Sequence, residues 1–195
     1  KYCYSNGIIT GDGQGHFFPT QGVTVVQAAK MLLVALGYEA EDRGYQNNSS
    51  WSVNIMKDAQ TAGLMTNINA KATDTLTRDG AAQMIFNALF ANTVTPKYAY
   101  DMGVQYVTEY TKGATLGYQS YGLVKKTTMV TGIDANGNAT LSDSSVGSVT
   151  VTGKLPATAD MVGSTVNLYL KGTLDSTGNI TAASKLYSSA LVTAN

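Results

Sequence analysis

The sequence is poor in residues that hold metals or form crosslinks, with one cysteine, Cys3, and one histidine, His16, in 195 residues. A single cysteine excludes an intrachain disulfide, so packing must stabilise the fold. One cysteine and one histidine are also too few for a structural zinc site. The chain has no Gly-x-Ser-x-Gly nucleophile elbow, and no pair of carboxylates stands out. The sequence therefore predicts no metal, no cofactor and no enzymatic activity.

Charge is scarce as well. Only 13% of residues are charged, and 13 basic residues balance 13 acidic ones to give a net charge of zero. A neutral chain without a basic cluster is a poor binder of nucleic acid, because such binding depends on neutralising phosphates. The longest apolar run, residues 31–36, falls far short of the roughly 20 residues that span a bilayer. We therefore expect neither nucleic-acid binding nor membrane insertion.

A polar but uncharged surface replaces the missing charge. Thr, Ser, Asn and Gly are abundant, and the chain has 12 tyrosines. An apolar content of 44% is enough for a real core, which excludes a wholly disordered chain. This composition is typical of a secreted protein that faces carbohydrate or forms a lattice.

An internal repeat organises the first half of the chain. A Gly-Ile-Ile triplet at Gly7 leads through a glycine-rich loop to a helix behind Thr24, and Thr24 and Gln27 have the spacing of a capping box. The unit returns at Gly63, 56 residues after Gly7, and at Thr77, 53 residues after Thr24. Two copies of one supersecondary unit are therefore expected, each needing a neighbour to bury its apolar face.

The order of these motifs resembles the S-layer homology (SLH) repeat: Gly-Ile-Ile-x-Gly, then Gly-x-Phe-x-Pro, then a threonine-led helix with an Ala-Ala-x-Met-Leu face. The resemblance covers residues 1–91, and the second copy lacks the Gly-x-Phe-x-Pro loop. It implies two SLH-like helical repeats in residues 1–92. The first is expected to be truncated, because the counterpart of Trp51 would precede Lys1.

The family resemblance also implies a binding site. In SLH repeats the signature Thr-Arg-Ala-Glu lies where the second helix begins, and its arginine engages an acidic sugar substituent. A guanidinium suits this role because its fork of donors can hold a carboxylate at two points. The second copy reads Thr77-Arg78-Asp79-Gly80, whereas the first, Thr24-Val25-Val26-Gln27, has lost both Arg and Glu. The candidate carbohydrate-binding residues are Arg78, Thr77, Asp79, Trp51 and Thr24.

Each of these assignments has a structural alternative. In the alternative interpretation Arg78 only faces solvent or pairs with Asp74 or Asp79, and Trp51 belongs to the core rather than offering a ring face to a sugar. The glycine-rich loop at 11–15 lacks the lysine and the preceding strand of a phosphate loop. It is therefore interpreted as a structural turn.

Hydrophobic periodicity predicts helices at 1–6 (closed by Gly7), 24–37, 51–62 and 77–91. Ser49 or Ser50 would cap the third helix, and 38–50 would be a polar connection. Phe17, Phe18 and Pro19 would fill the space between helices. The residues expected on buried helix faces are Ala28, Leu32, Ala35 and Leu36 on the second helix, and Trp51, Ile55, Met56 and Ala59 on the third.

The second half is predicted to be β-rich. Residues 93–122 are expected to form a Tyr-rich connecting segment with one short strand at 104–108. Residues 123–195 would form a β-domain with strands at 123–133, 139–141, 148–152 and 165–170 and a last strand from Ile180. Val166, Leu168 and Leu170 would face inward. The fold class is therefore α+β, with an N-terminal SLH-like repeat pair and a C-terminal small antiparallel β-barrel or sandwich.

The segment 134–138, Asp-Ala-Asn-Gly-Asn, has some likeness to a calcium loop. However, its glycine is fourth rather than sixth and its twelfth position is Ser145 instead of glutamate. A hairpin turn, in which Asn-Gly is strongly favoured, is the better interpretation.

Two functional hypotheses follow. The first is an extracellular, non-catalytic module at the cell wall or S-layer that attaches to cell-wall polysaccharide or a peptidoglycan-linked glycopolymer. The second is a structural subunit whose degenerate repeats bind no sugar and which self-associates or contacts other surface proteins. SLH modules commonly work as three repeats, so a pair would leave a helical face for residues before Lys1, another molecule or the β-domain to cover.

Overall fold

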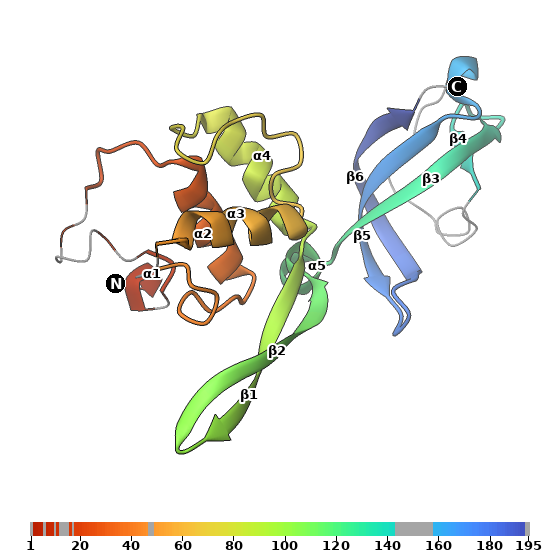
Figure 1. The fold of residues 1–195 in the computed structure, drawn as a ribbon. Helices are drawn as coiled ribbons and strands as arrows, with labels where there is room; N and C mark the ends of the chain where they lie inside the picture. Colours follow the sequence, from red (N-terminus) through yellow and green to blue (C-terminus); the bar gives the residue numbers. More distant parts are fainter. Residues whose placement is uncertain are drawn as a thin grey trace. The chain divides into compact units, whose positions relative to one another are not determined.

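The computed structural model divides the chain into two units, residues 1–116 and 117–195 (Figure 1). Phe17, most of the 11–15 loop and the strand predicted at 148–152 lie outside the residues that the structure describes. The described residues are 2–5, 7–9, 11, 16, 18–46, 49–142 and 158–193.

The helices of unit 1 (residues 1–116) are α1 (Tyr2–Ser5), α2 (Val25–Ala35), α3 (Trp51–Thr61) and α4 (Arg78–Leu89). The predicted capping box is confirmed, because Thr24 Oγ1 accepts from the Gln27 N–H at 3.4 Å and Gln27 Oε1 accepts from the Thr24 N–H at 2.9 Å. Ser50 is the N-cap residue of α3 but makes no side-chain cap hydrogen bond.

The repeat is also visible in the backbone. Gly7 and Gly63 both follow a helix and both have a positive φ, +68° and +78°. The hydrogen bonds that close the two helix ends have the same pattern, each shifted by 56 residues. The donor–acceptor pairs are Gly7–Tyr4 (3.1 Å) and Ile8–Cys3 (2.9 Å) in the first copy, and Gly63–Gln60 (3.1 Å) and Leu64–Ala59 (2.9 Å) in the second.

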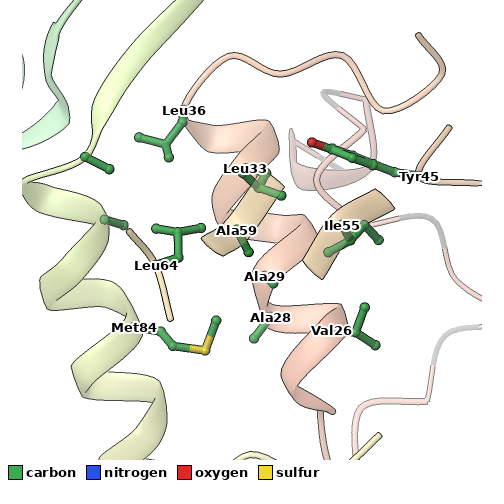
Figure 2. Close-up of a cluster of buried hydrophobic side chains, with 12 residues drawn as sticks. Val26, Ala28, Ala29, Leu33, Leu36, Tyr45, Ile55, Ala59, Leu64 and Met84 are labelled. Carbon is green, nitrogen blue, oxygen red and sulfur yellow. The ribbon is translucent and has the colours of Figure 1, made fainter. Parts of the chain in front are cut away.

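The core of unit 1 gathers around α2, whose side chains lie between those of α3 and α4 (Figure 2). The buried residues include Val26, Ala28, Ala29, Leu33, Leu36, Ile55, Ala59, Leu64 and Met84. Ile55 and Ala59 were correctly expected inside, whereas Ala35 is exposed and Leu32 and Met56 are only partly buried. Ala28 and Leu36 are buried as predicted, and the buried face of this helix also includes Ala29 and Leu33.

Residues 92–121 are more ordered than the predicted connecting segment. They form a hairpin of two strands, β1 (Asn92–Asp101) and β2 (Val104–Thr115), followed by the short helix α5 (Leu116–Tyr121). The base of the hairpin is held to the helices, since the Val94 N–H donates to the Leu36 carbonyl at 2.7 Å. The short strand predicted at 104–108 is thus part of a longer one.

Unit 2 (residues 117–195) contains a four-stranded antiparallel sheet in the order β4-β3-β5-β6. Its elements are β3 (Leu123–Ile133), β4 (Ala139–Leu141), the 3₁₀ turn η1 (Ala159–Met161), β5 (Thr165–Leu174) and β6 (Ile180–Thr193). Val166, Leu168 and Leu170 are buried as predicted. The described strands of this unit form one open sheet, so the predicted closed barrel is wrong, and no second sheet of the described part completes a sandwich.

The turn at 134–138 joins β3 to β4 as a hairpin turn, as expected. Asp134 Oδ1 accepts from the N–H groups of Asn136 (2.8 Å) and Asn138 (2.9 Å). The same pattern recurs between β5 and β6, where Asp175 Oδ1 accepts from the N–H groups of Thr177 (2.8 Å) and Asn179 (2.9 Å). The hydroxyl and amide groups that bond to Asp175 lower the pKa of its carboxyl.

These elements confirm the α+β class. They do not reproduce the predicted pairing of two SLH-type repeats, because α2 packs chiefly against α3, across the two copies. Among the described residues, no helix combines the length and the apolarity needed to cross a membrane.

Gly37, which follows α2, sits where the chain passes close to the hairpin base. Its φ is +104°, and a Cβ there would lie 2.1 Å from the carbonyl oxygen of Val94. We expect Gly37→Ala to lower the free energy of unfolding by about 3 kcal/mol or more, through backbone strain and the clash. Gly63→Ala is the matched control, because its φ is +78° but its Cβ would meet no atom within 4 Å, and about 1 kcal/mol is expected. Equal losses in urea unfolding would contradict the close approach.

Candidate functional site

The N-terminus of α4 carries three of the predicted site residues. Thr77 is the N-cap, with its Oγ1 accepting from the Gly80 N–H at 3.0 Å, and Arg78 and Asp79 form the exposed first turn. Asp74 accepts instead from the Lys71 N–H at 2.8 Å. Within the described part of the chain Arg78 has no ion-pair partner, so the predicted alternative of pairing with Asp74 or Asp79 is wrong. The guanidinium faces solvent.

The segments that lead into α2 and α4 lie side by side. The Leu76 N–H donates to the Val23 carbonyl at 2.8 Å, the Val25 N–H donates to the Asp74 carbonyl at 3.0 Å, and Thr24 forms an antiparallel bridge with Thr75. The two helix starts, equivalent by the repeat, are therefore brought together. Thr24 thus lies beside the chain that enters Thr77, although its own hydroxyl accepts within the capping box.

Trp51 lies elsewhere. It is the first residue of α3 and is 37% exposed, so the expectation of a core tryptophan is wrong. In the described structure no hydrogen bond, ion pair or ring contact joins Trp51 to Thr77, Arg78 or Asp79. Its ring is accessible to a sugar, but the structure shows no contact that would make it part of the same site.

A cavity of about 340 Å³ lies beside the start of α2, and the sequence did not point to it. Ile8, Ile9, Val23 and Met31 supply apolar walls, and the Lys30 amine is partly buried there, which lowers its pKa. Phe18 and Pro19 line this cavity too, but both are exposed, so their predicted role as a plug between helices is wrong.

The most constrained polar group is Asp58, a carboxylate buried on α3. Arg43 holds it at two points, with Nε to Oδ2 at 2.9 Å and Nη2 to Oδ1 at 2.6 Å, and the Tyr45 hydroxyl donates to Oδ2 at 2.6 Å. The bond to Asp58 raises the pKa of Arg43, and burial together with the same carboxylate raises the pKa of Tyr45. The polar composition of residues 38–50 predicts only a connection and gives no sign of this buried ion pair. The available signal was Asp58 itself, three residues after Ile55 on the same helix face.

A second set of contacts ties the hairpin to this connection. The Tyr110 hydroxyl donates to Asp42 Oδ2 at 2.9 Å and accepts from the Glu39 N–H at 3.3 Å, and the Tyr98 hydroxyl donates to the Glu39 carboxylate. The Arg43 guanidinium lies 5.7 Å from the centre of the Tyr110 ring. Burial is the main cause of the raised pKa of Tyr110.

Comparison with known proteins does not assign this chain to a family or a fold. No family model, no curated protein and no solved structure matches this chain. Among the described residues, no group of three or more His, Cys, Asp or Glu side chains is placed to hold a metal ion. Functional inference therefore depends on the chemistry of the sites above.

Removal of the Asp58 carboxylate should destabilise the fold. Asp58→Ala leaves the Arg43 guanidinium and the Tyr45 hydroxyl without their shared acceptor, and we expect the free energy of unfolding to fall by about 3 kcal/mol. Glu41→Ala, an exposed carboxylate in the same region, should change it by no more than about 0.5 kcal/mol. Urea unfolding of both variants measures the difference, and similar small effects in the two would show that the buried pair contributes little.

The raised pKa values of Tyr45 and Tyr110 predict a pH dependence. Below about pH 10 both the folded and the unfolded chain keep these protons. Above it the unfolded chain releases protons that the folded chain still holds, so the free energy of unfolding should fall. A Tyr45→Phe/Tyr110→Phe variant should show a flatter decline between pH 9 and 11, in urea titrations followed by circular dichroism. An unchanged slope would contradict the assignment.

Proposed function

We propose that this chain is a non-catalytic, extracellular cell-surface module whose helical unit attaches to an anionic cell-wall glycopolymer through the first turn of α4. The observation that carries the proposal is Arg78, an exposed guanidinium without an ion-pair partner in the described structure. The sequence resemblance to SLH repeats supplies the ligand class, a wall polysaccharide or peptidoglycan-linked polymer with acidic substituents.

The chemistry at this point supports the choice of an anion. A guanidinium can hold a carboxylate with two parallel hydrogen bonds. The N-terminus of a helix favours negative charge near its free N–H groups. Thr77 fixes where α4 begins, and the pairing of the Val23 and Leu76 segments fixes that start relative to α2. Arg78 therefore projects from a well-anchored backbone position.

A structural subunit is the second candidate. The observation that favours it is the β1–β2 hairpin, on which Tyr98, Tyr100, Met102, Val104 and Tyr106 are exposed. Exposed apolar and aromatic patches of this kind often mark protein contacts. In this alternative the repeats serve as a scaffold and bind no sugar.

The test is binding of the protein to purified Gram-positive cell walls, with and without their acid-extractable polymers. We expect polymer-dependent binding that Arg78→Ala weakens about tenfold or more, the loss that follows from removing a charge-assisted hydrogen bond. Arg78→Lys keeps the charge but not the fork and should bind with intermediate affinity. Lys112→Ala removes a cation from the exposed hairpin and should bind like the unaltered protein.

Circular dichroism of each variant would confirm that it is folded. Polymer-dependent binding that Arg78→Ala leaves unchanged would move the site away from α4. A folded protein that binds neither wall preparation would refute attachment and leave the structural candidate.

A further inference from the structure

The hairpin presents an open strand edge lined by exposed side chains. Tyr100, Met102 and Val104 are 72%, 98% and 65% exposed, and the hairpin extends away from the helices of unit 1 (Figure 1). Within the described residues β1 pairs only with β2. A two-stranded ribbon is marginally stable in water, and an open edge is a template for another strand.

The turn geometry shows which groups face this edge. Met102 and Gly103 both have positive φ, +46° and +81°, and Asp101 lies opposite Val104. In a two-residue turn of this kind the flanking residues form a hydrogen-bonded pair, and antiparallel pairs alternate along the strands. The main-chain groups of Tyr98 and Tyr100 are therefore directed to the outer edge of β1.

The sequence along this edge is complementary to itself when reversed: Lys97-Tyr98-Ala99-Tyr100-Asp101. In an antiparallel pair centred on Ala99, each Lys97 lies opposite the partner's Asp101, and each Tyr98 lies opposite the partner's Tyr100. Opposite charges and aromatic pairs at directly opposed positions stabilise neighbouring strands. The arrangement therefore provides two reciprocal ion pairs and two aromatic pairs.

The surroundings of the edge agree with this register. Lys97 already contacts the Glu109 carboxylate across the hairpin, and the partner's Asp101 would be a second carboxylate beside the same amine. Pro96 has no N–H to donate, so it ends the pairing just beyond Lys97. On β2 the residues opposite this segment near the hairpin tip, 104–108, are uncharged and offer no such ion pairs.

We propose that β1 is the interface with a second copy of this chain. Residues 97–101 pair antiparallel about a two-fold axis at Ala99, and the two hairpins become one four-stranded sheet. A two-fold contact of this type uses the same surface on both copies and closes as a dimer. This assignment is independent of the wall-binding proposal, because it involves neither Arg78 nor the helix starts.

A charge exchange tests the proposal by sedimentation equilibrium of the whole chain. Asp101→Lys places two lysines opposite each other, and Lys97→Asp places two aspartates opposite each other. Each variant alone should dimerise about tenfold or more weakly than the unaltered protein. An equimolar mixture of the two restores both ion pairs and should associate again. Lys112→Asp makes the same kind of charge change on β2 and should leave association unaltered.

A crosslink fixes the register. In a Cys3→Ser background, Ala99→Cys brings two thiols together at the proposed axis, and mild oxidation of a dilute solution should yield a covalent dimer. Gln105→Cys, on β2, should not crosslink under the same conditions. An unaltered protein that remains monomeric throughout the concentration range would overturn the proposal. So would a dimer that Asp101→Lys does not weaken, because association would then use another surface.

Discussion

The burial of Asp58 is the constraint on which the arrangement of unit 1 depends. A carboxylate can lie inside a helical core only if its charge and its acceptor sites are matched. Arg43 and Tyr45 meet that need from a segment that has no helix or strand of its own. Because the ion pair fixes this segment against α3, it also places Glu39 and Asp42, which hold Tyr98 and Tyr110 of the hairpin. One buried charge thus determines where an apparently separate element lies.

The sequence predicted correctly those parts of the fold that depend on interactions between residues close together in the chain. The capping box at Thr24, the helix end closed by Gly7 and the Asp-x-x-Gly-Asn turn at 134–138 depend on residues within five positions of one another, and they form as expected. The alternation in β5 also placed its buried residues correctly. The predictions that were wrong concern features that depend on residues far away in the sequence. Trp51 was expected inside because its spacing puts it on the same helix face as Ile55 and Ala59, but nothing local shows that this end of the helix is open to solvent.

The hairpin was missed for a related reason. Apolar and polar residues alternate only weakly along its strands, because both faces carry tyrosine and threonine. Most of its side chains are exposed. Strand prediction relies on one buried face, and this ribbon has little of one. The candidate site was predictable in part. Arg78 followed from the repeat, but only the structure shows that no carboxylate of the described residues pairs with it.

The contacts at the hairpin base have a mechanical consequence. Force applied at the tip of β1 is transmitted to the helices, because hydrogen bonds hold the base of the hairpin to them. It passes through the Val94–Leu36 hydrogen bond to the end of α2, and through Tyr98 and Tyr110 to the segment that Arg43 fastens to α3. Two sets of contacts therefore share the force on the hairpin. One ends at α2, and the other ends at the Arg43–Asp58 ion pair on α3.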